Sequence, residues 1–316
     1  MEVKQENIMK NTLCKKDRKG FVLSLVLWIT AAMMLLSVLF IRMTKEETAI
    51  YKQIHYRTKL KFQTSALFEK LCFYAATGKF HQNTLSNRLD PFPKELKLDG
   101  TEYNVTQKGT FCQYSLFDQS GLFNLRFLLT PYAAQKLIEQ STGKAYPFQD
   151  IYLDWIDKYD SARLNGAEKN DYLLSGYKNF PPNYNAFQQR DAMKQLKDFN
   201  KFDENISKKI RQNFTTYGNV ALNIMLLNRV RLQALFPQLG KNEITRLLTL
   251  QKEKPDQYLH YFTSSSYTQD VYGLFPAKVV RIIVKCQHKN VKTKIKAIID
   301  FRATNAKSWA ILEMYK

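Results

Sequence analysis

Acidic side chains gather in one short stretch of this 316-residue chain. Asp150, Asp154 and Asp157 lie four and three residues apart, so on a helix they would share one face. Like charges this close repel one another, and oxygen ligands without His or Cys favour a hard cation such as calcium. The candidate metal ligands are Asp154, Asp157, Asp160, Glu168 and Asp171. Their spacing differs from that of an EF-hand loop.

Two other interpretations of this acidic stretch stay open. Lys158, Arg163 and Lys169 lie nearby and would neutralise the carboxylates without a metal. Asp154 and Asp157 also form a carboxylate pair of the kind that glycosidases use. Neighbouring positions on one helix suit ion binding better than the opposed groups of such a catalyst. We therefore expect no enzyme activity, and the sequence also contains no GxxxxGK[ST] phosphate loop.

Cysteine and histidine residues offer little chemistry. There is no CxxC, and the four histidines are scattered, so neither a zinc site nor cysteine–histidine catalysis is supported. Beyond Cys14 the chain has Cys72, Cys112 and Cys286, which allow one disulfide at most. Cys112 and Cys286 both fall in strand-like stretches. Three buried free thiols are the simpler expectation.

A long apolar helix is the clearest element that the sequence predicts. Residues 21–41 carry no charge, and a helix of that length spans about 30 Å, one hydrocarbon core. The run is longer than that of a secretory signal peptide. Neither Gly nor Pro occurs from Phe21 to Thr77, so the helix can continue as an amphipathic half over residues 42–80. Its apolar stripe includes Ile50, Ile54 and Leu67.

Basic residues flank this helix on its N-terminal side. Lys15, Lys16, Arg18 and Lys19 precede it, whereas acidic residues follow Lys45. The positive-inside rule then predicts a single-pass inner-membrane protein, with its N-terminus in the cytoplasm and its C-terminal domains in the periplasm. An ordinary membrane anchor would show the same basic flank.

Strand-like alternation appears on both sides of a helical region. Residues 103–117 alternate with period two, as do 278–285 and 292–302, and residues 308–315 add a final strand. Residues 122–260 show helical periods and no clear strand. The sequence predicts an α+β fold. A long N-terminal helix would join an antiparallel sheet head made of residues 95–118 and 264–316, with an all-helical insertion over residues 119–263.

Several motifs resemble those of one protein family. Gly20 and Phe21, between basic residues and the apolar helix, resemble the processing site of type IV prepilins and pseudopilins. Leu25 stands where most of these proteins have Glu, a departure that resembles protein K of the type II (general) secretion pathway. The family's Asp-x-x-Gly-x-Asn-Leu, Asp-Trp-Ile-Asp and Gly-Ala-Glu motifs are similar to segments beginning at Asp118, Asp154 and Gly166. Tyr159 displaces the last acid of the second motif by one place.

The resemblance implies a function in assembly. A peptidase would cut between Gly20 and Phe21, removing the leader 1–20, and the new N-terminus would be methylated. The chain would then be a minor pseudopilin at the tip of the type II secretion pseudopilus, where it initiates and caps the filament. Implied partners are other minor pseudopilins, the major pseudopilin, the prepilin peptidase, the inner-membrane assembly platform, and the secretin or the secreted cargo. The resemblance also implies calcium at the acidic cluster.

Two rival functions remain at this stage. A minor pilin of a type IV pilus or DNA-uptake filament would share the leader and the helix, but not the Asp-Trp-Ile-Asp and Gly-Ala-Glu motifs. A membrane-anchored periplasmic hydrolase would use Asp154 or Glu168.

The chain is strongly basic, with a formal net charge of +20. Its basic residues are spread without a dense run, which favours an anionic lipid, a polysaccharide or an acidic partner over a nucleic acid.

Overall fold

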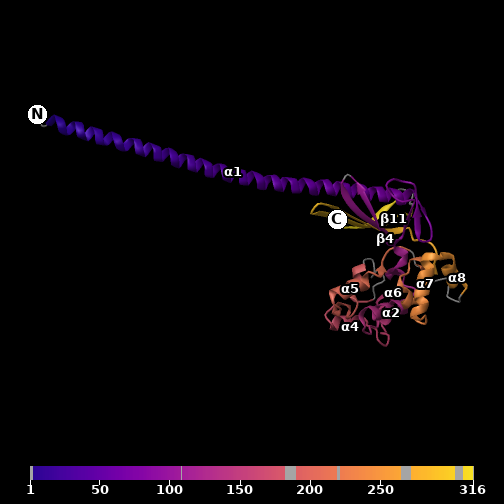
Figure 1. Ribbon diagram of the computed structural model, residues 1–316. Coiled ribbons are helices and arrows are strands. Elements are labelled where there is room, and N and C mark those ends of the chain that lie inside the picture. Colours follow the sequence, from indigo (N-terminus) through magenta and orange to yellow (C-terminus); the bar gives the residue numbers. More distant parts are fainter. Residues whose placement is uncertain are drawn as a thin grey trace. The chain divides into compact units, whose positions relative to one another are not determined.

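The computed structural model describes residues 3–107, 109–181, 190–218, 221–264, 272–302 and 309–315 (Figure 1). Residues 1–2 of the predicted leader, and residues 265–271, 303–308 and 316 of the predicted head, lie outside the described residues. The chain forms two compact units, Met1–Lys61 and Phe62–Lys316. Helix α1 (Val3–Thr77) begins in the first unit and ends in the second.

The first unit consists of helix α1 alone. Its apolar side chains, among them Leu25, Trp28 and Phe40, are exposed. Such a surface needs lipid or another protein to cover it. Within the described residues, α1 is the one helix long and apolar enough to cross a membrane. From Phe21 onward neither Gly nor Pro interrupts the helix, which continues to Thr77, directly before Gly78.

A five-stranded antiparallel sheet forms the centre of the second unit. Its strand order is β12-β11-β10-β5-β4. Strands β4 (Asp99–Gln107) and β5 (Thr110–Asp118) form one hairpin, and β10 (Val279–His288) and β11 (Val291–Asp300) form another. Strand β12 (Ala310–Tyr315) pairs with β11. These strands agree with the alternation read from the sequence.

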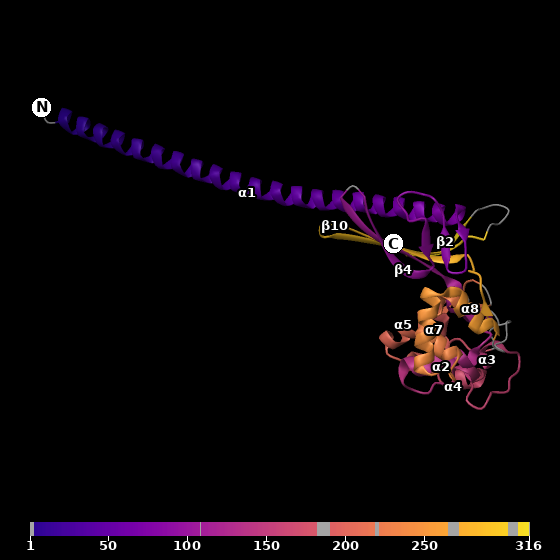
Figure 2. The same cartoon turned by 45° about the vertical axis from the view of Figure 1, so that its right-hand side comes forward.

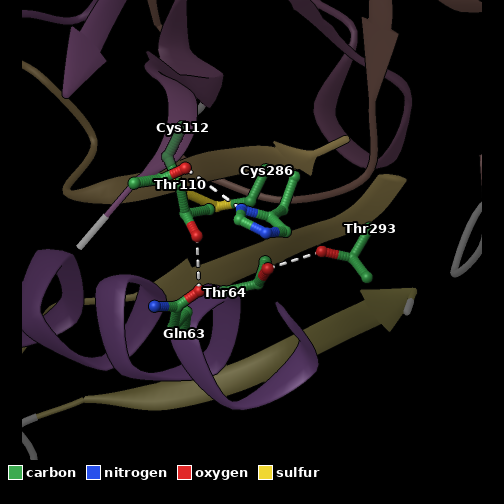
Figure 3. Close-up of a disulfide and its surroundings, with 8 residues drawn as sticks. Gln63, Thr64, Thr110, Cys112, Cys286 and Thr293 are labelled. Carbon is green, nitrogen blue, oxygen red and sulfur yellow. Dashed lines mark hydrogen bonds between the residues drawn. A yellow bond between two sulfur atoms is a disulfide. The ribbon is translucent and has the colours of Figure 1, made fainter. Parts of the chain in front are cut away.

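One face of this sheet packs against the last turns of α1 (Figure 2). Buried side chains alternate along β10, as at Val280, Ile282 and Val284, which is the pattern of a strand with one covered face. Thr64 of α1 contacts Thr293 of β11, with 2.5 Å between their hydroxyl oxygens. Thr110 of β5 donates to the side-chain oxygen of Gln63 at 2.6 Å (Figure 3).

A disulfide joins the two central strands, contrary to the expectation of three free thiols. Cys112 of β5 and Cys286 of β10 are bonded, with their Cα atoms 4.1 Å apart (Figure 3). The expectation was wrong because the register that sets these residues opposite each other joins positions 174 residues apart. No local pattern reveals such a register. Cys72 is buried and free, as expected.

Short strands appear in two regions where the sequence showed none. The predicted helix over residues 42–80 ends at Thr77, and the segment after it contains β1 (Lys79–Phe80) and β2 (Thr84–Ser86). These two strands form a three-stranded sheet with β3 (Glu95–Lys97). The insertion is not all-helical. Strand β6 (Phe123–Asn124) pairs in parallel with β7 (Phe214–Thr215), and β8 (Leu222–Asn223) with β9 (Tyr272–Gly273). Pairs of two residues are too short to show alternation.

The insertion separates β5 from β10, and the rest of its described residues form helices, 3-10 turns and loops (Figure 1). Its helices are α2 (Pro131–Thr142), α3 (Phe148–Ile156), α4 (Lys169–Leu174), α5 (Glu204–Arg211), α6 (Arg229–Leu235), α7 (Lys241–Glu253) and α8 (Pro255–Ser264). Short 3-10 turns η1 (Gln119–Gly121), η2 (Leu125–Phe127), η3 (Arg190–Gln195), η4 (Phe199–Lys201) and η5 (Ile224–Leu226) connect them.

Two hydrophobic cores hold the insertion together. The first is rich in aromatic side chains and includes Phe148, Trp155 and Phe214. The second core consists of side chains from η5, α6, α7 and α8 and includes Phe236, which caps α6, and Tyr258 of α8. Trp155 and Tyr172 meet edge to face, with ring centroids 5.0 Å apart.

Candidate functional site

The predicted processing site lies within α1, in the first unit. Gly20 and Phe21 are both helical, and the side chain of Phe21 is exposed. The predicted acidic site lies in the second unit, where α3 ends and α4 begins.

Arg163 neutralises the centre of the acidic stretch. Asp154 is fully buried near the end of α3, and Asp157 is the residue that caps this helix. One guanidinium nitrogen of Arg163, Nη1, pairs with Oδ1 of Asp154 and with Oδ2 of Asp157, the latter at 2.6 Å. The backbone N–H of Arg163 donates to Oδ2 of Asp154 at 3.1 Å. The hydrogen bonds that Arg163 donates to the two carboxylates, that to Asp157 foremost, raise the pKa of Arg163.

A glycine makes room for the buried carboxylate. A Cβ on Gly166 would lie 1.7 Å from Oδ2 of Asp154 and 2.7 Å from its Cγ. No side chain fits there unless Asp154 moves. The absence of a side chain at Gly166, in the Gly-Ala-Glu segment, therefore allows the Asp154 carboxylate to approach the backbone.

Glu168 and Asp171 form the start of α4. The Asp171 carboxylate accepts a hydrogen bond from the Glu168 backbone at 3.0 Å, and the Glu168 side chain accepts one from the Asp171 backbone. This is a capping box, which satisfies backbone donors that the helix leaves free. Asp171 also lies 3.8 Å from the ammonium group of Lys197.

Glu168 carries a carboxylate in an unfavourable place. Only 6% of the residue is exposed, and its Oε1 is buried without a hydrogen-bond partner among the described residues. Burial raises the pKa of Glu168 to about 7, and the charges of Asp154, Asp157 and Asp160 add to this effect. The group is thus about half protonated near pH 7.

The structure brings part of the predicted metal set together. Asp154, Asp157 and Glu168 are neighbours, Asp160 is exposed nearby, and Asp171 serves as a helix cap. Among the described residues, no three His, Cys, Asp or Glu side chains are placed to hold a metal ion together. Neutralisation by Arg163 is confirmed. Lys169 instead lies over the ring of Phe180, 5.2 Å from its centroid.

This geometry gives Asp154 no accessible oxygen for a substrate. Both of its carboxylate oxygens accept hydrogen bonds from Arg163, and the residue is fully buried. A glycosidase-like pair would need a carboxylate that opens to a cleft.

A second buried carboxylate, which sequence reasoning treated only as a family motif, ties the insertion to the sheet. Asp118, at the end of β5, is fully buried. It accepts hydrogen bonds from Ser120, through N at 2.8 Å and Oγ at 2.5 Å, and from the backbone N–H groups of Ala277 at 3.0 Å and Lys278 at 3.1 Å. Burial raises its pKa, and these hydrogen bonds oppose the rise. Asp118 thus joins the start of the insertion to its return.

The sequence contained one signal for this junction. Asp118-x-Ser120 directly after an alternating strand is an N-cap pattern, and Asp118 does cap η1. The next motif residue, Gly121, packs closely, since a Cβ there would lie 2.8 Å from Cβ of Leu226. Asn124 caps the following turn η2. The segment from Asp118 to Leu125, which reads Asp-x-x-Gly-x-x-Asn-Leu in this chain, therefore builds the entrance of the insertion.

Comparison with known proteins bears on the fold. No protein-family model matches the sequence. No curated protein matches it either. The structure is similar to a chain in the crystal structure of the GspK-GspI-GspJ complex from the enterotoxigenic Escherichia coli type 2 secretion system. The TM-score is 0.54 at 14% sequence identity, and the match covers 85% of this chain and 98% of that chain.

This chain has a GspK-like pilin fold. The predicted fold class is confirmed: a long N-terminal helix, an antiparallel sheet and further helices between two of its strands. The resemblance to the type II secretion protein K family, read from the sequence, agrees with this match.

Proposed function

We propose that this chain is a minor pseudopilin at the tip of a type II secretion pseudopilus, where it initiates and caps the filament. One observation carries the proposal. The chain combines a helix able to cross a membrane with a sheet whose neighbouring strands β5 and β10 are separated in sequence by a large insertion. The match to the GspK-GspI-GspJ structure covers 85% of this chain.

The exposed apolar surface of α1 would supply the helix–helix contacts that drive assembly. Side chains such as Leu25, Trp28 and Phe40 would contact lipid before assembly and the helices of neighbouring subunits afterwards. Leu25 brings no carboxylate into the bilayer, so it needs no neighbouring amine to neutralise it. This supports the topmost position, which has no earlier subunit.

The partners follow from the same proposal. The matched structure is a complex named for three components, which supports two other minor pseudopilins as direct partners. The prepilin peptidase, the major pseudopilin, the inner-membrane platform, and the secretin or the cargo would act at other stages. The N-terminus would lie in the cytoplasm and the second unit in the periplasm. The chain would act by assembly and not as an enzyme.

Processing gives the first test. The intact mass of the protein, extracted from membranes of its native host, should lack residues 1–20 and carry one extra methyl group. The variant Gly20→Val should keep the full-length mass. A wild-type protein that retains its leader would contradict the proposal.

Deletion of the gene separates the proposal from the type IV pilus alternative. Export of folded proteins across the outer membrane should stop, while twitching and DNA uptake continue. Loss of twitching or DNA uptake, with export intact, would favour the pilin alternative. Complementation with the wild-type gene should restore export.

We also propose that the acidic cluster binds calcium in competition with Arg163. The all-oxygen side chains and the unsatisfied Oε1 of Glu168 support this. The side chain of Arg163 is 37% exposed, so it has room to move away from Asp154. Calcium chloride should raise the thermal unfolding midpoint relative to chelator, and Arg163→Gln should enlarge that rise.

Arg302→Gln is the matched control for the calcium experiment. Arg302 also pairs with a carboxylate, that of Asp300 at 2.6 Å, but in the sheet and far along the chain. Its removal should leave the response to calcium unchanged. If calcium shifts neither the wild type nor Arg163→Gln, the calcium proposal fails while the pseudopilin proposal stands.

A further inference from the structure

A large basic cavity lies in the second unit, lined by both the sheet and the insertion. Its volume is about 1030 Å³. Eight of its lining residues are Lys or Arg, and none is Asp or Glu. The sheet contributes Arg281, Lys294 and Lys296, and the insertion contributes Lys208, Arg229 and Arg231, among others.

Strand alternation explains the basic wall on the sheet. In β11, Ile295 and Ala297 are buried, whereas Lys294 and Lys296 alternate with them and point to the opposite face. The buried residues share the face of Thr293, which contacts α1. The lysines therefore occupy the face turned away from α1.

Arg231 is the most constrained of these cations. It is 4% exposed, donates to the carbonyl of Gly121, and donates through Nε to Oδ1 of Asn228 at 3.2 Å. Both partners are neutral, and among the ion pairs formed by the described residues none includes Arg231. A buried charge without a counter-ion is costly.

A second guanidinium adds to this cost. The Cζ atoms of Arg231 and Arg281 lie 5.6 and 4.9 Å from the centroid of the same ring, Phe117. The ring offsets part of the repulsion through cation–π contacts. Burial, and then the charge of Arg281, lower the pKa of Arg231 to about 9. An anion entering the cavity would relieve both effects. Of the cations in the wall, Arg211 already has a carboxylate partner, Glu204 at 2.7 Å.

We propose that this cavity binds an acidic peptide segment of a protein partner. Guanidinium and ammonium groups would pair with its Asp or Glu carboxylates. The cavity also presents side-chain amides, such as Gln140 and Gln212, which suit peptide backbone groups, and apolar side chains, such as Val230 and Ile283, which suit the intervening residues. A small inorganic anion would leave the apolar surface unused. The assignment does not depend on the proposed role in secretion.

Peptide binding by the full chain in a nonionic detergent tests the proposal. The probe is a fluorescein-labelled decapeptide of alternating Glu and Leu, followed by fluorescence anisotropy. Lys208→Gln with Lys294→Gln removes one exposed cation from each wall, and we expect binding to weaken about tenfold. Added salt should weaken it further.

Matched probes and variants keep the result specific. Lys241→Gln with Lys254→Gln removes the same charge from exposed positions on α7 and its end, outside the cavity, and should change binding less than about twofold. The decapeptide with Gln in place of Glu should not bind. Equal binding of that peptide, equal loss in the control variant, or tighter binding of inorganic triphosphate than of the acidic peptide would overturn the proposal.

Discussion

Two buried carboxylates in this molecule, those of Asp118 and Asp154, are satisfied in different ways. Asp118 accepts hydrogen bonds from three backbone N–H groups and one hydroxyl, all neutral. Asp154 accepts from the Arg163 guanidinium and backbone, with Glu168 close by. Both residues are fully buried.

The kind of hydrogen-bond donor decides what each carboxylate can do. Backbone donors are fixed by the fold, so the Asp118 site can only hold the two ends of the insertion together. The Arg163 guanidinium belongs to a partly exposed side chain and is not fixed by the backbone, which is the basis of the proposed competition with calcium. The first site is a junction, and the second is a candidate for regulation by ions or protons.

The largest effect is expected from Asp118→Ala. The variant leaves the N–H groups of Ser120, Ala277 and Lys278 without their acceptor, which should lower the free energy of unfolding by about 4 kcal/mol. Denaturant unfolding followed by circular dichroism measures it. Asp160→Ala, at an exposed acid, should cost less than about 0.5 kcal/mol in calcium-free buffer. Similar losses in both variants would remove the distinction between junction and surface.

An intermediate effect is expected from Gly166→Ala. The added Cβ would collide with Oδ2 of Asp154 and displace it from Arg163, at a cost of about 3 kcal/mol. Gly240→Ala is the control, because a Cβ there meets nothing within 4 Å. If both variants unfold at the same denaturant concentration as the wild type, the close approach of Gly166 to Asp154 has no energetic weight.

The smallest effect is expected from Glu168→Gln, which should stabilise the protein at high pH. Since the folded-state pKa of Glu168 is raised from 4.5 to about 7, its contribution to stability is complete below pH 4.5 and is lost as the pH rises through about 7. Glu168→Gln keeps a side-chain acceptor for the Asp171 backbone without the charge. With chelator present, it should be more stable than the wild type at pH 8 by about 1 kcal/mol, and no more stable at pH 4.5.

Thermal unfolding of the wild type and of Glu168→Gln from pH 4.5 to 8 measures this difference in stability. A difference that stays constant from pH 4.5 to 8 would mean that folding does not change the pKa of Glu168. The acidic site would then not respond to protons, unlike what its comparison with Asp118 predicts.

Much of the fold could be predicted from local sequence patterns. The uninterrupted apolar run and the period-two alternation around Tyr103 and Ile282 depend on near neighbours, and they gave the helix and the main strands. Residues 95–118 and 264–316 were placed in one sheet, but the register of β5 against β10 was not predicted. The strands β1, β2 and β6–β9 were not predicted, because two or three residues are too few to show an alternating pattern.

The acidic site was predictable in composition but not in geometry. Asp154 and Asp157 were identified from their spacing, and Glu168 as a nearby acid in the same stretch. Arg163 was one of three side chains expected to neutralise them. That Gly166 touches Asp154, and that Asp171 caps a helix, follows from a turn whose path no pattern encodes. Asp118 was harder, because its partners Ala277 and Lys278 lie about 160 residues away.

The separation of β5 from β10 has a consequence for biogenesis. Strand β5 ends at Asp118 and β10 begins at Val279. If the second unit crosses the membrane as proposed above, β5 precedes β10, and its edge stays unpaired until residues 119–278 have followed. Such an edge invites pairing with other chains. Non-local pairing of this kind is also slow, because the loop must close before its contacts form. The central pair of the sheet is thus among the last elements to assemble, and a helper that shields β5 during export would protect the whole head from aggregation.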